Sequence, residues 1–390
     1  MVGPFLPDAE KLAAVRDALP AVSAGIYLNT PVVGPLPAET ARAMADIAEW
    51  ELTTGRAHRD RAEDVAVRVD EARAGLAAIL GTDVDAIVLT HGIEDALRRV
   101  IGAVDWRRGE RILVVSDAGA KATLTHLRPP VADGETDVVE LSTEPDASDD
   151  AALVASVEAG ITAGTRLVVC PHVSVFGQLL PVDRLARVAH EAGAMLLVDG
   201  SQAAGAIPVS VEALGADLYV VPAWTWLLGP EGIAGMAAAG DIGRRLAPRN
   251  ADGGFHLPSV VGMARSCGWL SMYVGLEWIF DRSAAIAAAA RQRLGAIPGV
   301  RLQAPGEGVT PSLAFRIDGW DGEAALDELG ARVFALASVI DEADAIRIGP
   351  GFFTTEDEID RFAAAVELLA THTPENLPPR RQLTIIGGDR

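Results

Sequence analysis

The sequence predicts an α/β protein with a large, mostly parallel β-sheet covered by helices, followed by a smaller α+β domain. Short apolar runs alternate with helical patterns through the first two thirds of the chain. Strands that are apolar along their whole length are typical of a parallel sheet covered on both faces. After about residue 245 the pattern changes, because a Gly- and Pro-rich segment precedes a long helical stretch and a few separated strands.

The elements of the larger domain follow from the spacing of apolar residues. The strand candidates are the runs at 86–89, 111–115, 138–141, 167–170, 195–198 and 218–221. The helical patterns cover 36–50, 61–80, 94–104, 123–127, 151–159 and 182–192.

The smaller domain mixes both kinds of element. Its helical patterns cover 268–295, 322–330 and 356–371, and its strand candidates are 300–303, 312–317 and 346–348. We therefore divide the chain into four parts: an N-terminal segment (1–26) that packs with the small domain, a large domain (27–250), a small domain (251–373) and a polar tail (374–390).

Charge and composition exclude several classes of partner. The chain has 390 residues and a net charge of −21 at pH 7. Nucleic acids and anionic membranes are bound by basic surfaces, so neither is expected as a partner. A content of 49% hydrophobic residues is enough for a large core. The sequence has neither a signal-peptide pattern nor a run of about 18 apolar residues, so we expect a soluble, cytoplasmic protein.

Four segments together resemble the class V aminotransferase family. They are YLNTPVVGPLP (27–37), the stretch 172–205 with its VDGSQAAG end, WLLGPEG (226–232) and IRIGPGFFTTEDEID (346–360). The resemblance covers nearly the whole chain. It implies the fold of the fold-type I enzymes, which use pyridoxal 5′-phosphate (PLP), and a homodimer with the cleft at its interface. Cysteine desulfurases and C–S lyases belong to this group.

Three positions depart from the family's pattern. Thr225 stands where the resemblance requires the lysine that bonds to PLP, and a hydroxyl cannot replace a primary amine in that reaction. Glu94 stands where the resemblance requires the phosphate-binding hydroxyl, and a carboxylate there repels a phosphate and can occupy the helix N-terminus. Ala120 stands where an aromatic ring stacks on the cofactor.

Other positions match the family. The resemblance implies that Asp199 pairs with the ring nitrogen of PLP, that Gln202 bonds the ring hydroxyl and that Arg347 binds a substrate carboxylate. His172 and Ser174 match the end of the preceding strand. Two alternatives stay open, because Asp199 could be a buried acid held by backbone N–H groups and Arg347 could belong to a salt bridge between domains.

The sequence has only two lysines and two cysteines. Lys11 lies in an N-terminal helical stretch and should be solvated, whereas Lys121 lies on the loop that normally stacks on PLP. Neither Cys170 nor Cys267 suits the nucleophile of a desulfurase, which needs a mobile loop. We therefore expect no cofactor, and PLP in particular is not expected.

The resulting hypothesis is a repurposed enzyme that works without PLP on a small organic molecule through lyase, isomerase or cyclase chemistry. A carboxylate on that molecule would bind Arg347. The residues predicted for proton transfer are Asp199, His172, His91 and Glu94. The residues predicted to bind the substrate are Arg347, Gln202, Thr225, Trp224, Trp226 and Asn29. The two tryptophans could equally be packing residues.

Two other functions remain open. The chain could be a non-catalytic partner subunit of an active PLP enzyme, or a PLP-dependent lyase or aminotransferase that holds its cofactor in an unusual way.

Overall fold

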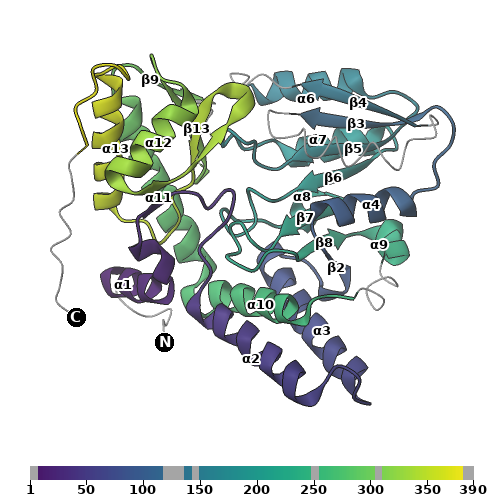
Figure 1. Cartoon of the computed structure of the whole chain (residues 1–390). Helices are drawn as coiled ribbons and strands as arrows, with labels where there is room; N and C mark the ends of the chain where they lie inside the picture. Colours follow the sequence, from purple (N-terminus) through teal and green to yellow (C-terminus); the bar gives the residue numbers. More distant parts are fainter. Residues whose placement is uncertain (1–7, 117–135, 143–148, 247–253, 304–309, 381–390) are drawn as a thin grey trace.

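The computed structural model describes residues 8–116, 136–142, 149–246, 254–303 and 310–380. Within these residues the chain forms a large α/β domain and a smaller domain beside it (Figure 1). The elements that the sequence places at 123–127 lie outside the described residues, as do Ala120 and Lys121.

The large domain is built on a sheet in the order β2-β8-β7-β6-β5-β3-β4. Its strands are β2 (Ile87–Thr90), β3 (Glu110–Ser116), β4 (Thr136–Ser142), β5 (Thr165–Pro171), β6 (Met195–Asp199), β7 (Leu218–Pro222) and β8 (Ala234–Ala238). β8 is antiparallel to both of its neighbours, and the other described pairs of the sheet are parallel. The expected α/β class with a mostly parallel sheet is confirmed.

Helices cover both faces of this sheet. They are α2 (Ala38–Thr54), α3 (Arg61–Leu80), α4 (Ile93–Ala103), α6 (Asp150–Gly160), α7 (Val182–Glu191), α8 (Val211–Leu214), α9 (Gly240–Leu246) and α10 (Leu257–Gly268). Alternate strand residues enter two separate cores, one containing side chains of α3, α7 and α10 and the other side chains of α4 and α9. This alternation is the two-residue period of a strand buried on both faces.

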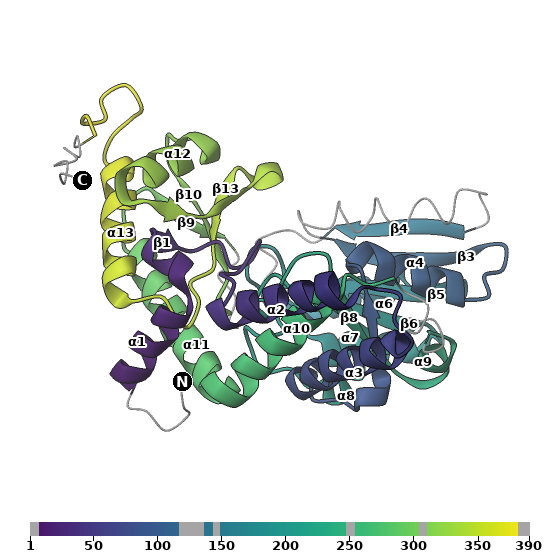
Figure 2. The same cartoon turned by 60° about the horizontal axis from the view of Figure 1, so that its bottom comes forward.

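The small domain packs three helices on a sheet in the order β12-β13-β10-β9. Its elements are η5 (Trp269–Val274), α11 (Leu276–Gly295), β9 (Val300–Gln303), β10 (Leu313–Ile317), α12 (Gly322–Val333), β11 (Ala335–Leu336), β12 (Ser338–Ile340), η6 (Asp341–Ala343), β13 (Ala345–Ile348) and α13 (Glu356–Ala370). The N-terminal elements are α1 (Asp8–Ala18), η1 (Pro20–Ser23) and β1 (Ile26–Tyr27), and η2 (Val84–Ala86) precedes β2. β1 pairs with β11, which ties the N-terminal segment to the small domain (Figure 2).

Several elements differ from the sequence expectation, which did not predict α8, α9, α10, β11 or β12. The long helix predicted over 268–295 is interrupted, because the chain forms a π-helical turn and then Gly275 adopts a φ of 91° before α11 begins. β8 was not predicted, because its sequence AGMAA lacks the β-branched and aromatic residues typical of strands. Its place between β2 and β7 comes from tertiary pairing.

The division at residue 250 stays a prediction, but the packing of α10 bears on it. Buried residues of α10, among them Leu257 and Met263, belong to the same core as the large sheet and α3. The change of sequence pattern near residue 245 therefore does not mark the point where one hydrophobic core ends and the next begins.

Among the described helices, none is both long and apolar enough to cross a bilayer.

A loop after β5 joins the two domains. Phe176 packs with Ala314, Ile340 and Ala345 of the small domain. Beside it, the Thr310 hydroxyl donates to the carbonyl of Gly177 over 2.6 Å. This loop begins at the carboxyl end of β5, so the same segment borders the sheet edge and contacts the small domain.

Candidate functional site

The sequence-predicted residues gather at one edge of the large sheet. Pro171 pairs with Asp199, while Thr90 and Pro222 both pair with Ala234 of the antiparallel β8. The carboxyl ends of β2, β5, β6 and β7 therefore lie at the same edge. In open α/β sheets ligands bind outside the carboxyl ends of the strands, so this edge is the candidate site.

His172 follows β5 and is held by two neighbouring strands. Its backbone N–H donates to the carbonyl of Asp199, and its Nδ1 lies 2.7 Å from the hydroxyl of Tyr219 on β7. Burial lowers the pKa of His172 to about 4 and raises the pKa of Tyr219 well above its usual range. The imidazole is therefore neutral at pH 7, and an imidazolium acid is not available from this residue.

Asp199 ends β6, and its carboxylate binds the turn that follows. Oδ1 accepts hydrogen bonds from the backbone N–H of Ser201, at 2.9 Å, and from the Ser201 hydroxyl. The hydroxyl of Thr225 donates to the carbonyl of Ser201 over 2.9 Å, and Thr225 is buried. Thr225 is thus fixed beside the Asp199 turn. That it occupies the family's lysine position stays a prediction.

Gln202 connects two segments of the backbone. Its Nε2 donates to the carbonyl of Pro31 over 2.9 Å, and its Oε1 accepts from the indole N–H of Trp226 at 3.4 Å. The Gln202 amide therefore links the segment at Pro31 to Trp226, whose side chain is buried. Trp224 is half-buried, and the far end of its ring comes close to Gly92 at the start of α4.

The first turn of α4 contains the carboxylate of Asp95, which bonds to groups near the start of the helix. Asp95 accepts a hydrogen bond from the backbone N–H of His91 and an ion pair from Arg99, and these interactions lower the pKa of its carboxyl. Asp95 thus bonds back to the residue that precedes the helix cap, and Glu94 is exposed. The predicted place of Glu94 at the phosphate position stays a prediction. The exposed ring of His91 stacks on Phe255, with centroids 4.6 Å apart.

Arg347 belongs to the small domain, and Asn29 lies in the segment that pairs with the chain just beyond it. Arg347 lies on β13 and donates from Nε to the hydroxyl of Ser338 at 3.5 Å. Asn29 forms a parallel bridge with Gly349, two residues beyond Arg347. Within the described part of the chain, the buried Oδ1 of Asn29 has no hydrogen-bond partner. The two side chains therefore belong to neighbouring backbone segments.

The expectation for Lys11 is wrong. Its side chain is buried, and its Nζ lies 4.6 Å from the centre of the Trp278 ring on α11. An ammonium is attracted to the face of an aromatic ring, so Lys11 packs against α11 and is not solvated. Cys170 and Cys267 are buried, and burial raises the pKa of each thiol to about 12. Neither thiol is poised to form a thiolate.

The model of the aminotransferase class-V family matches residues 26–256, which include the strand ends of the candidate site but not Arg347. The chain belongs to the class V aminotransferase family. This family assignment confirms the resemblance, and the fold agrees with it.

Two relatives and one solved structure illustrate the class V similarity. A probable cysteine desulfurase of Methanothermobacter thermautotrophicus is 29% identical over 62% of this chain, and the match spans 59% of that relative. Isopenicillin N epimerase of Streptomyces clavuligerus is 26% identical over 88% of this chain and 94% of its own length. A lysine-to-alanine mutant of C-DES, with glycine covalently linked to its PLP cofactor, covers 90% of this chain and 98% of its own with a TM-score of 0.83 at 19% identity.

The expectation of no cofactor is contradicted by these comparisons, because a protein of the same fold holds PLP. The described residues fit PLP only in part. Asp199 is present at the strand end, but the buried Thr225 hydroxyl offers no amine. Lys11, the lysine within the described residues, is directed onto Trp278. A cofactor bonded to the chain at position 225 therefore does not fit this class V site.

Sequence reasoning missed Tyr219 and Ser201, and it named Asp95 only as an ordinary acid of the first helical turn. Tyr219 was included in an apolar strand, although a tyrosine in a strand buried on both faces needs a partner for its hydroxyl. That need is the signal that could have linked it to His172. The roles of Ser201 and Asp95 arise from turn geometry that the sequence alone does not specify.

Proposed function

We propose that this chain is an isomerase- or lyase-type enzyme of the class V aminotransferase family. In this proposal it acts on a small molecule that bears a carboxylate, and it binds PLP without a covalent bond to residue 225. The observation that carries the proposal is the buried Thr225 hydroxyl, which donates to the Ser201 carbonyl beside the carboxylate of Asp199.

Acid–base chemistry is supported by the groups at the sheet edge. Asp199 supplies a carboxylate held by the turn that follows β6, and the neutral His172 directly follows β5, where it can bind the substrate but does not supply an imidazolium acid. Arg347 supplies a planar guanidinium, which suits recognition of a carboxylate. The likeness to isopenicillin N epimerase supports an isomerase-type reaction in particular.

Cysteine desulfuration is not supported, although several relatives are described as desulfurases. A desulfurase nucleophile has to form a thiolate. Both cysteines of the chain are buried with a pKa of about 12, so fewer than one thiol in about ten thousand would ionise at pH 7.

Binding of PLP without attachment is supported by the C-DES mutant, in which a chain that has lost a lysine still holds PLP linked to glycine. The proposal predicts that the unmodified chain binds PLP in equilibrium dialysis but gives no borohydride-trapped adduct on the peptide that contains Thr225. Thr225→Lys should give a stable adduct at position 225, because a primary amine then lies beside Asp199.

Thr225→Gln is the matched control, since it is similar in length and has no primary amine. Peptide mass mapping separates the outcomes. An unmodified chain that retains no PLP, or one that carries the adduct on Lys121, would contradict the proposal. Deuterium uptake from D2O at the carbon beside a carboxylate, followed by NMR over a panel of amino acids, reports the proton transfer shared by isomerases and lyases.

We also propose a homodimer, in agreement with the expectation from the family. A groove of about 910 Å³ runs between α2, α3, α10 and η5, which lie together along one side of the molecule (Figure 1). Trp50 and Tyr273 line it, and two strongly exposed apolar side chains, Leu52 and Met272, lie on the same elements. Exposed apolar side chains around a groove are typical of a protein interface.

A double variant, Leu52→Glu with Met272→Glu, should shift the chain from dimer to monomer in light scattering coupled to size exclusion. The reason is that two buried charges in the interface would lack partners. Leu336→Glu is the control, because it introduces the same charge at an exposed apolar residue of the small domain. A dimer that persists in the double variant would exclude this face.

A further inference from the structure

Tyr219 lies beneath the candidate site, and its ring is closely packed on all sides. It is fully buried on β7, and a Cβ added to Gly200 would lie 2.1 Å from its ring and 2.8 Å from its hydroxyl oxygen. Gly200 directly follows Asp199. The turn that carries the Asp199 carboxylate therefore passes over the tyrosine ring, and only glycine allows this close approach.

The hydroxyl of Tyr219 and the ring of His172 form a buried pair. The oxygen lies 2.7 Å from Nδ1, and the two rings meet edge to face at 86°. Within the described residues, His172 is the hydrogen-bond partner of this hydroxyl, and the bond uses Nδ1 of the ring. The pair therefore has two possible arrangements, which differ in the nitrogen that carries the proton.

The two arrangements differ in how they satisfy the buried hydroxyl. If Nδ1 donated, the tyrosine would accept and its own O–H proton would have no acceptor, which leaves a buried donor unsatisfied. If the tyrosine donates, its proton is satisfied and Nδ1 uses its lone pair. In that arrangement the imidazole proton resides on Nε2, on the side of the ring away from Tyr219.

We propose that Tyr219 is a positioning residue that fixes His172 as a neutral imidazole with its proton on Nε2. His172 then presents an N–H donor at the sheet edge, and it selects for a bound molecule that has an acceptor oxygen or nitrogen at that point. Only this last step rests on the proposed function, because it assumes that the ligand binds at this edge.

The electrostatic surroundings agree with this assignment. The titratable groups that act on the pair are Cys170 on β5 and Asp199 on β6. Burial, together with these two groups, raises the pKa of Tyr219, so the phenol keeps the proton that it donates. Burial also disfavours the imidazolium form of His172. The role of His172 changes accordingly, from the proton transfer that the sequence suggested to hydrogen-bond donation.

The test is ¹⁵N NMR of the histidine ring nitrogens at pH 7, on the full chain without added PLP or other ligand. The His172 signals are assigned by their loss in His172→Asn. In the unmodified chain we expect one tautomer with the proton on Nε2. In Tyr219→Phe we expect loss of that single tautomer, with signals averaged between the two forms.

Tyr27→Phe is the matched control, because it removes the hydroxyl of a partly buried tyrosine that donates to the Val33 carbonyl at 2.8 Å. It should leave the His172 tautomer unchanged. A proton on Nδ1 in the unmodified chain would overturn the proposal, and this measurement stands even if Tyr219→Phe does not fold. An unchanged Nε2–H tautomer in a folded Tyr219→Phe would also overturn it. Since no ligand is present, failure of the proposed function would not affect either result.

Discussion

Gly177→Ala is expected to lower the free energy of unfolding by about 4 kcal/mol, because two effects combine at this position. Gly177 has a φ of 91°, which L-residues rarely adopt. A Cβ there would lie 2.0 Å from the carbonyl oxygen of Ser312 in the small domain. Chemical denaturation followed by fluorescence measures the loss, and the variant should separate the loop after β5 from the small domain.

Gly193→Ala separates the two effects. Gly193 has a similar φ of 76°, but nothing lies within 4 Å of an added Cβ. Its loss should therefore be about 1 kcal/mol, the conformational part alone. Equal losses in the two variants would show that the contact with Ser312 does not matter. A much larger loss in Gly177→Ala would support the view that this loop holds the two domains together.

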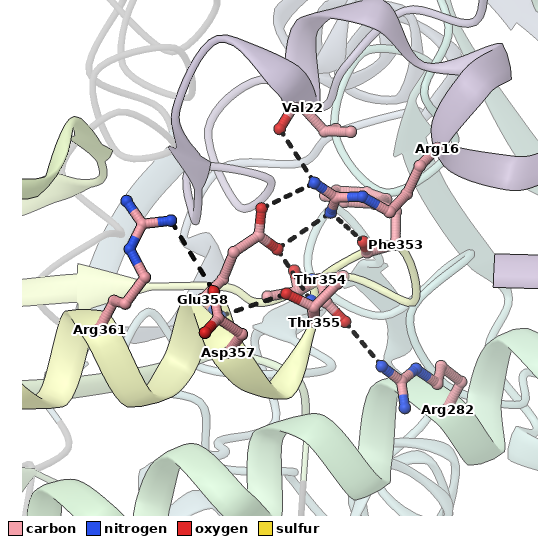
Figure 3. Close-up of polar contacts among 10 residues, drawn as sticks. Arg16, Val22, Arg282, Phe353, Thr354, Thr355, Asp357, Glu358 and Arg361 are labelled. Carbon is pink, nitrogen blue, oxygen red and sulfur yellow. Dashed lines mark hydrogen bonds and ion pairs between the residues drawn. The ribbon is translucent and has the colours of Figure 1, made fainter. Parts of the chain in front are cut away.

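Glu358→Ala is expected to cost about 3 kcal/mol, because it breaks a largely buried ion pair and a helix cap at the same time. Glu358 receives both terminal nitrogens of Arg16, at 3.0 and 2.9 Å, and the backbone N–H of Thr355 at 2.8 Å (Figure 3). Arg16 also donates to the carbonyl of Phe353. The pair therefore joins α1 to the first turn of α13. Thermal unfolding measures the loss.

Arg361→Ala is the control on the same helix. Its side chain is half-exposed, and it lies 3.9 Å from Asp357, so removing it should change the free energy of unfolding by less than about 0.5 kcal/mol. Arg16→Leu should reproduce most of the loss, since Glu358 would then remain buried without its partner. A loss within the range of the control would contradict the role given to this pair.

Much of the candidate site could be predicted because it lies in local sequence patterns. Asp199 and His172 directly follow apolar strands, so a correct assignment of the strands also places these residues at one sheet edge. Gln202 and Trp226 were assigned to substrate binding from their positions, which stays a prediction, and the structure adds a hydrogen bond between them. Their directions depend on where the segment at Pro31 crosses the site, which the local sequence does not reveal.

The sequence alone determined the fold class, the family, the scarcity of lysine and the strand ends where polar residues collect. These properties depend on periodicity and composition within short windows. Tertiary structure decided that Lys11 is buried against Trp278 and that Tyr219 supports His172. It also placed α10 in the core of the large domain. The physical reason is common to all three, since hydrogen bonds and burial between elements distant in the chain exist only once those elements pack.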